Sequence, residues 1–281
     1  MPLPLRVIST HHHEAVDWAT RASAAGGSVR TTTVRALSDL CADIDRAGIR
    51  SKIVRLNLFV GGFSAVTIPL YRSTSYGGSV VGGTSDTNNS FVSGDYAETG
   101  SSSGLTGNGT TKYLDTGLNA NTYSADNWHI GVGLRATQTG GAAFKCIVGA
   151  YNNANNGLEL DARRSGTAAG DRAVFFTRFG TASDRFGDDV NTAALAVGDI
   201  VAAWPSMYRD GTASGTTATT SQDYPSAHKI YVFALNNSNS STINYTDARL
   251  NWYSLGQTMT SSEVSSFTTA IQRFNTALSR T

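Results

Sequence analysis

Two segments decide the fold: Gly104-Leu-Thr-Gly-Asn-Gly-Thr-Thr-Lys-Tyr-Leu-Asp-Thr-Gly-Leu118 and Asp247-Ala-Arg-Leu-Asn-Trp-Tyr-Ser-Leu-Gly-Gln-Thr-Met-Thr-Ser-Ser-Glu263. In the first, a glycine-rich turn leads into a run whose two faces alternate, as in a strand that follows a turn. These faces carry Tyr113, Asp115 and Gly117 on one side and Leu114, Thr116 and Leu118 on the other. In the second segment, an alternating run stops at Gly256 and helical spacing begins at Thr260. The pair predicts the opening and the closing of one β-sandwich.

The two segments resemble the turn-strand and the closing strand of concanavalin A-like jelly rolls, in particular laminin-G-like modules. The resemblance covers roughly Tyr96 to the C-terminus. A second resemblance lies in Asp43-Ile-Asp-Arg-Ala-Gly-Ile-Arg-Ser-Lys-Ile-Val-Arg-Leu-Asn-Leu-Phe-Val-Gly-Gly62, which is similar to a leader found ahead of such jelly rolls in structural proteins of tailed bacteriophages. Arg50 replaces the usual aromatic residue of that leader, and Asn57-Leu58 replaces its usual Tyr-Pro.

Composition excludes several classes of protein. Charged residues make up 15% of the 281 residues, glycine accounts for 29 of them, and the net charge is +1 with no basic block. Many short strands joined by turns fit this profile, and a nucleic-acid partner does not, because that interaction needs clustered Lys and Arg. The longest apolar run, residues 56–70, is too short and too interrupted to span a membrane. We expect Cys41 and Cys146 to be buried thiols.

Three helices are predicted around the strands. Residues 13–25 and 31–47 form two of them within a helical leader, residues 1–66, and the jelly roll follows as residues 67–281. The third helix, residues 260–279, begins at a capping box made by Thr260 and Glu263. Both terminal regions carry apolar stripes, for which we expect a role in assembly with partner proteins as well as packing on the sandwich. The stripe residues are Val34, Leu37, Leu40 and Ile44 in the leader and Phe267, Ile271 and Phe274 in the last helix.

Eight strand candidates with turn signals between them suit a two-sheet antiparallel jelly roll. Within them Trp128 and Trp252 are in phase with aliphatic residues, which predicts that both lie in the core. The candidates are residues 112–118, 128–136, 143–151, 158–164, 172–179, 199–207, 229–235 and 248–254.

A search for catalytic residues finds no complete set. Glu159 and Asp161 share a strand face and resemble the start of the E-x-D-x-x-E signature of laminarinase-like hydrolases, but Arg163 and Arg164 stand where the second glutamate is required. We therefore interpret this face as a charged outer surface and expect no enzyme activity. The run His11-His-His13 lacks the spacing of a structured metal site and is interpreted as a helix entry.

Loops supply the candidate binding residues, as they do in many sandwiches. Asp184, Asp188 and Asp189 offer oxygen ligands for calcium, although solvated turn residues are the simpler interpretation. Aromatic residues at the edges of two long loops are candidates for ligand contact: Tyr208, Tyr224 and Tyr245.

The resemblance implies a function. We expect a non-enzymatic structural component of a phage particle, either capsid-decorating or part of a tail or fibre. It would lie in the virion in many copies or as a homo-oligomer, bind other virion proteins and contact host-surface glycan. Two alternatives stay open on the same fold, namely a polysaccharide-degrading glycoside hydrolase and a free lectin.

Overall fold

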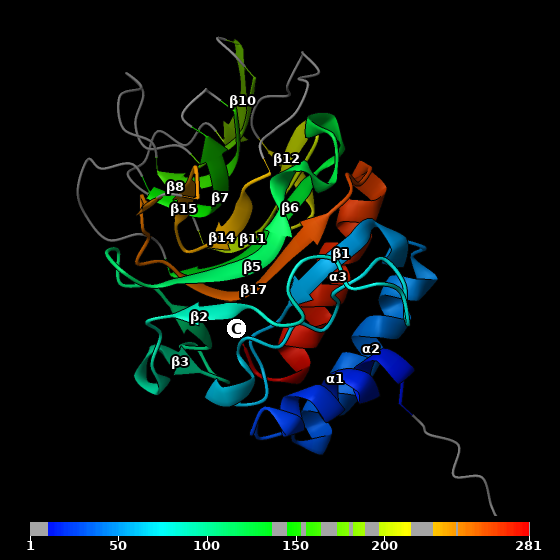
Figure 1. Cartoon of the computed structure of the whole chain (residues 1–281). Coiled ribbons are helices and arrows are strands. Elements are labelled where there is room, and N and C mark those ends of the chain that lie inside the picture. Colours follow the sequence, from blue (N-terminus) through cyan, green and yellow to red (C-terminus); the bar gives the residue numbers. More distant parts are fainter. Residues whose placement is uncertain are drawn as a thin grey trace, which may run out of the picture.

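A computed structural model of the chain describes residues 11–136, 145–152, 156–163, 173–179, 182–188, 197–214, 227–239 and 241–280. These residues form two β-sheets packed face to face, with helices over the outer face of one sheet (Figure 1). The predicted mainly-β sandwich with N-terminal and C-terminal helices is confirmed.

Sheet A joins strands from both ends of the chain. Its central strands are β6 (His129–Ala136) and β17 (Arg249–Gly256), which pair antiparallel. From one edge to the other the sheet contains β13 (Thr212–Ser214), β12 (Ser206–Arg209), β11 (Gly198–Ala203), β6, β17, β4 (Gly104–Thr106) and β3 (Tyr96–Ala97), and β1 (Ile53–Asn57) also pairs with β17.

Sheet B contains the opening strand of the sandwich, β5 (Tyr113–Asn119). Its order is β10 (Ala182–Asp188), β9 (Ala173–Phe179), β8 (Asn156–Arg163), β7 (Lys145–Asn152), β14 (Lys229–Val232), β5 and β2 (Thr87–Asn89). A short hairpin of β15 (Leu235–Asn237) and β16 (Ser241–Ile243) joins β7, with β15 parallel to it.

The predicted alternation of β5 is confirmed. Its apolar phase, including Leu114 and Leu118, is fully buried between the sheets, and Tyr113 and Asp115 on the other phase are partly exposed. Trp128 lies in the same core and Trp252 lies in a second core beneath the helices, so the predicted burial of both is also confirmed. The strand expected over residues 199–207 is two strands, since the chain turns at Trp204-Pro205 between β11 and β12.

Three α-helices cover the outer face of sheet A: α1 (His13–Ala24), α2 (Thr31–Arg46) and α3 (Ser261–Ala277). Short 3₁₀ turns connect the elements at Arg50–Lys52, Phe63–Ala65, Ser93–Asp95, Ala120–Thr122 and Ala125–Asn127. The capping box of Thr260 and Glu263 is present, and Glu263 also accepts a hydrogen bond from Lys52 at 2.6 Å. In the described part of the chain, no helix has the length and apolarity to cross a membrane.

The apolar stripes require a correction, because they are used inside the chain. Six of the seven stripe residues expected to serve assembly are at most 2% exposed and pack with one another, with β1 and with the outer face of sheet A; these are Leu37, Leu40, Ile44, Phe267, Ile271 and Phe274. Val34 is half-buried. Either a sheet of the same chain or a partner protein can cover the apolar face of a helix pair. Here sheet A covers it.

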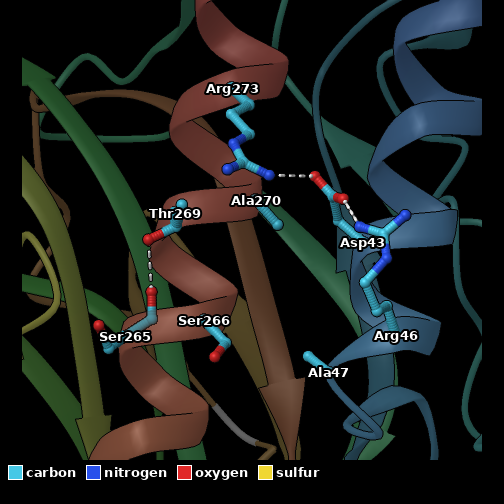
Figure 2. A pocket seen from close by; sticks show the side chains of 8 residues that line it. All are labelled: Asp43, Arg46, Ala47, Ser265, Ser266, Thr269, Ala270 and Arg273. Carbon is cyan, nitrogen blue, oxygen red and sulfur yellow. Dashed lines mark hydrogen bonds and ion pairs between the residues drawn. The ribbon is translucent and has the colours of Figure 1, made fainter.

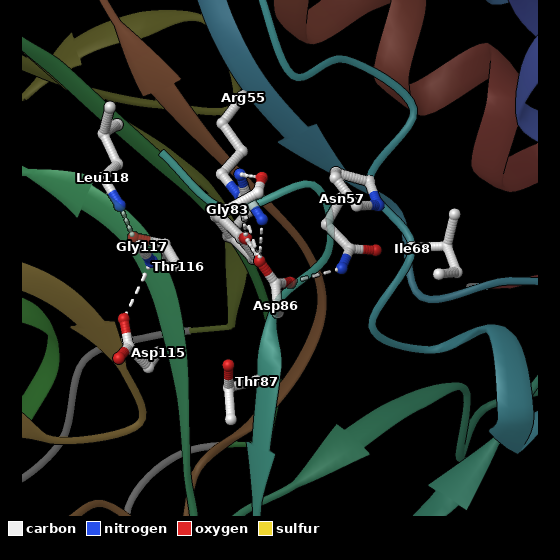
Figure 3. Close-up of polar contacts among 12 residues, drawn as sticks. Arg55, Asn57, Ile68, Gly83, Asp86, Thr87, Asp115, Thr116, Gly117 and Leu118 are labelled. Atoms are coloured by element: carbon white, nitrogen blue, oxygen red, sulfur yellow. Dashed lines mark hydrogen bonds and ion pairs between the residues drawn. The ribbon is translucent and has the colours of Figure 1, made fainter. Parts of the chain in front are cut away.

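A buried polar cluster connects the leader to sheet B. Arg55 of β1 and Asp86, just before β2, are both fully buried as side chains and form an ion pair. Asn57 donates to Asp86 at 2.7 Å (Figure 3). The hydroxyl of Tyr253 also donates to Asp86, at 2.7 Å. Burial alone would lower the pKa of Arg55, but the Asp86 carboxylate raises it. The cluster fixes the segment that enters β2, and the expected domain boundary at residue 66 falls after a strand that belongs to sheet A.

Candidate functional site

The structure separates the predicted binding residues. Asp184 and Asp188 lie on strand β10, not in a loop, and Asp189 and Tyr224 lie outside the described residues. Tyr208 lies on β12 and is only 7% exposed within the core beneath the helices, so its expected place at a binding loop is wrong. Tyr245 is partly exposed and lies beside two other tyrosines.

These tyrosines form a cluster on the outer face of sheet B. Tyr113 of β5 and Tyr231 of β14 have ring centroids 4.6 Å apart, and Tyr245 meets Tyr113 edge-on at 6.2 Å. All three are partly exposed. Tyrosine combines an apolar ring with a polar tip, so a partly exposed cluster offers both a flat contact surface and hydrogen-bonding groups. We call these three residues the tyrosine cluster.

Polar groups border the tyrosine cluster. Asp115 lies directly opposite Tyr231 across the β5–β14 pair, so the two side chains share a face. Its carboxylate accepts a hydrogen bond from the backbone N–H of Gly117 at 2.7 Å (Figure 3) and pairs with Lys229 at 3.1 Å. Gly117 has φ of +68° and lies against the backbone of Gly83, where a Cβ would be 2.4 Å from a nitrogen atom, so this turn requires glycine. The Asp115 side chain is thereby held in place.

Burial raises the pKa of Tyr231 to about 12, and the neighbouring Asp115 carboxylate and Tyr113 act in the same direction. The Tyr231 hydroxyl is therefore protonated at neutral pH. It can donate a hydrogen bond while its ring packs on Tyr113.

Sequence reasoning missed Tyr113, Tyr231, Asp115 and Lys229. The signal was available, because Tyr113 and Tyr231 both occupy the phase of their strands that also carries charged residues. An aromatic residue in the polar phase of a strand lies on the solvent side of the sheet. Packing in the core therefore does not explain why an aromatic residue is present at that position.

The face carrying Glu159 and Asp161 requires a second correction. It was expected to be a charged outer surface, yet Glu159 is 2% exposed and Asp161 is fully buried. The hairpin of β15 and β16 joins β7 next to this face, and Leu235 reaches within 2.8 Å of the position that a Cβ on Gly149 would take, with Cys146 and Glu159 alongside. Burial, then the two carboxyl groups, raises the pKa of the Cys146 thiol well above its ordinary value.

This burial bears on the hydrolase alternative. A glycosidase needs a pair of carboxyl groups that reach the sugar from a cleft. Glu159 and Asp161 do not reach solvent, so the arrangement does not offer them to a substrate.

A second polar region lies where α1 meets the segment after β1. Both oxygens of Glu14 accept hydrogen bonds from Arg50, whose guanidinium lies 3.8 Å over the ring of Tyr71. A pocket of about 210 Å³ next to this pair is bordered by Tyr76, which is 60% exposed and meets His13 edge-on. Glu14 is buried and Arg50 half-buried because they bind each other, so we assign them a structural role.

Within the described residues, His12, Glu14 and Cys41 place possible metal ligands within 4.8 Å of one another. Their chemistry does not suit a metal. Nδ1 of His12 caps α1 by accepting the Glu14 N–H, Nε2 contacts Asp45 at 3.0 Å, and Glu14 is bound to Arg50. Burial raises the pKa of Cys41 to about 12, which keeps the thiol protonated. The interpretation of this histidine run as a helix entry is confirmed for His12.

No protein-family model and no curated protein matches the chain. Among solved structures it is similar to the NanB sialidase of Streptococcus pneumoniae, at 16% identity and a TM-score of 0.43, over 58% of this chain and 27% of that one. It is similar to a Trypanosoma rangeli sialidase mutant that displays trans-sialidase activity, at 12% identity and a TM-score of 0.43, over 92% and 38%. Domain 4 of AbnA, a Geobacillus stearothermophilus arabinanase, solved with arabinotriose, matches at 9% identity and a TM-score of 0.34, over 58% and 75%.

These comparisons correct the expected function. The similar structures named above are sialidases and an arabinanase domain, and none is a virion protein, so the expected non-enzymatic component of a phage particle finds no support among them. The chain spans less than half the length of the sialidases. At such low identity the likeness concerns the fold alone, and the proposal below rests on the residues of this chain.

Proposed function

We propose that this chain is a carbohydrate-binding, lectin-like jelly roll whose binding surface is the tyrosine cluster with Asp115 and Lys229. The observation that carries the proposal is three partly exposed tyrosines on the outer face of sheet B, of which Tyr113 contacts both Tyr231 and Tyr245. The outer face of sheet A is covered by helices, whereas the outer face of sheet B is partly exposed at the tyrosine cluster, where a ligand can reach it.

The chemistry of this surface matches a sugar. The C–H groups of a pyranose ring pack on aromatic faces, and its hydroxyls bond to carboxylates, ammonium groups and phenols. Tyr113 and Tyr231 supply the ring surface, Asp115 accepts hydrogen bonds from sugar hydroxyls, and Lys229, whose side chain is 49% exposed, donates to them. This surface binds the sugar without cleaving it, since Asp115 is the one carboxylate among its five residues and glycoside hydrolysis needs a pair.

A glycan array tests the proposal with the whole chain. Tyr231→Ala should weaken binding to any glycan detected by about tenfold, equivalent to about 1.4 kcal/mol, and Tyr231→Phe should weaken it less because the ring remains. Tyr76→Ala is the matched control, since Tyr76 is an exposed tyrosine that meets His13 of α1 and is not part of the tyrosine cluster. A silent array, or equal losses for Tyr231→Ala and Tyr76→Ala, would refute the proposal.

Calcium is a separate arm of the same experiment. The proposed binding surface has one carboxylate, that of Asp115, which is too few for an oxygen-ligated calcium site. We expect glycan binding to survive chelation by EDTA. Loss of binding on chelation, restored by calcium, would place the ligand elsewhere and favour the aspartate region of β10.

The hydrolase alternative has its own test. Reducing-sugar release from a bacterial capsular polysaccharide that falls when Glu159 is replaced by Gln would show catalysis by this carboxylate. We expect no release, because Glu159 is buried. A virion location and virion partners stay predictions, as does a multicopy or homo-oligomeric state, which light scattering in solution would measure.

A further inference from the structure

A pocket of about 340 Å³ lies between the end of α2 and the middle of α3 (Figure 2). Charged and hydroxyl side chains line it together with two small alanine side chains. The residues that form it are Asp43, Arg46 and Ala47 from the α2 side and Ser265, Ser266, Thr269, Ala270 and Arg273 from α3. Because the helices cover sheet A, this pocket is separate from the tyrosine cluster on sheet B.

Two arginines from different helices share one carboxylate in this pocket. Arg46 donates to one oxygen of Asp43, and Arg273 donates to the other at 3.3 Å (Figure 2). The three side chains leave a net charge of +1. Asp43 orients both guanidinium groups toward the same space, and each guanidinium has five N–H donors, most of which these bonds leave unused.

Exposure makes those donors reachable. The side chains of Arg46 and Arg273 are 71% and 68% exposed, whereas that of Asp43 is 19% exposed. A ligand that enters the pocket therefore meets the two cations before it meets the anion. Such an exposed ion pair adds little to folding stability, so stability does not explain why two arginines are placed here.

The hydroxyl groups differ in what they offer. Ser266 and Thr269 donate to backbone carbonyls one turn earlier, at 2.9 and 2.8 Å. Ser265 also borders the pocket, but its side chain lies beside Gly211, on the side of α3 away from Asp43, so the arginines are the donors that face a ligand near Asp43 (Figure 2). The negative end of the α2 dipole lies at this pocket too, where Arg46 in the last turn counters it. Attraction at a distance is therefore weak, and a ligand must be held by direct hydrogen bonds.

We infer that this pocket binds a tetrahedral oxyanion, a phosphate or sulfate group, between Arg46 and Arg273. The guanidinium fork matches two oxygens of such a group, and two forks together can contact all of its oxygens. The pocket volume also admits a sugar that carries the group as an ester. The chemistry is the same for the free ion and for the ester.

Isothermal titration of the full chain with inorganic phosphate and with glucose 6-phosphate tests the inference, with glucose as the neutral control. We expect saturable binding of at least one of the two anions, lost by at least about tenfold in the Arg46→Gln/Arg273→Gln double variant. Asp43→Asn should strengthen binding by about threefold, because it removes the competing negative charge while the amide oxygen can still accept a hydrogen bond from a guanidinium group. If orientation of the arginines by the Asp43 carboxylate outweighs its charge, the variant binds more weakly.

Arg35→Gln is the matched control, since Arg35 is an exposed arginine of α2 that does not border the pocket. The inference would be overturned if Arg35→Gln weakened anion binding as much as the double variant does, if neither anion gave saturable binding, or if Asp43→Asn bound more weakly. Tighter binding of glucose 6-phosphate than of phosphate would identify an ester as the ligand, and equal binding would identify the free ion. Tyr231→Ala should leave anion binding unchanged, so failure here and failure of the proposed glycan surface are distinguishable.

Discussion

His129 should make the stability of this protein depend on pH. It is fully buried at the start of β6, under the ring of Phe267 from α3. Nδ1 lies 2.7 Å from the carbonyl oxygen of Gln257, which can only accept, so Nδ1 carries the proton and donates. Nε2 is then the acceptor for the hydroxyl of Ser254 at 2.8 Å. The neutral ring has both of its hydrogen bonds.

Burial lowers the pKa of His129 from 6.5 to about 4; the bond to the Gln257 carbonyl raises it in part, and the charge of Lys52 lowers it further. The unfolded chain therefore binds a proton more readily than the native chain. The neutral histidine is favourable to folding above pH 6.5, and stability is lost as the pH falls toward 4. The full loss is about 3 kcal/mol, of which about 2 kcal/mol falls between pH 7 and pH 5.

Urea unfolding of the wild type and of His129→Asn at pH 7 and pH 5 measures this effect. The asparagine amide can still donate to the Gln257 carbonyl but does not titrate in this range. Carboxyl groups contribute equally to both proteins, so the difference between the two pH dependences isolates the histidine. We expect the wild type to lose about 2 kcal/mol more than the variant. Equal losses would show that the buried ring is protonated without penalty and would refute the argument.

Three further outcomes follow from buried or capping groups. Asp86→Ala should lower the free energy of unfolding by about 3–5 kcal/mol, because it leaves the Arg55 guanidinium buried without its carboxylate; a loss below about 1 kcal/mol in urea unfolding would contradict the structure. Thr260→Ala should lower it by about 1 kcal/mol by removing the cap of α3, and Thr260→Ser should restore most of it; equal thermal midpoints for all three proteins would argue against the cap. Cys41 and Cys146 should react with a thiol reagent only after denaturation, since both are fully buried with raised pKa values; rapid labelling of the native chain would show that they are accessible.

Local patterns in the sequence predict the strands well where one phase is apolar. The opening strand β5 and the closing strand β17 occur where alternation places them, and the capping box begins α3. Short strands escaped prediction, because β2, β3 and β4 have two or three residues each and hardly any period to detect. Strand β10 was interpreted as a loop of solvated turn residues, with calcium ligation as the alternative, since its aspartates suggest a turn.

The sequence of a strand does not show whether another segment covers its polar face. The alternation in β6 suggests that His129 lies on a solvent face, yet helices α2 and α3 cover sheet A and the whole first part of β6 is buried. The same limit applies to β8, where Glu159 and Asp161 suggest an outer surface but are buried. Which strand lies under a helix depends on contacts between distant segments.

The sequence by itself determined the sandwich, the capping box of its last helix and the apolar phase of its strands, because these follow from spacing between near neighbours. Only the tertiary structure decided which surface is free to bind. It placed Tyr113, Tyr231 and Tyr245 together although they are separated by up to 132 positions in the chain. It also turned the apolar stripes of α2 and α3 inward and brought Arg46 and Arg273 to one carboxylate. The physical reason is that exposure and charge pairing are set by packing between segments far apart in the chain, which no local period records.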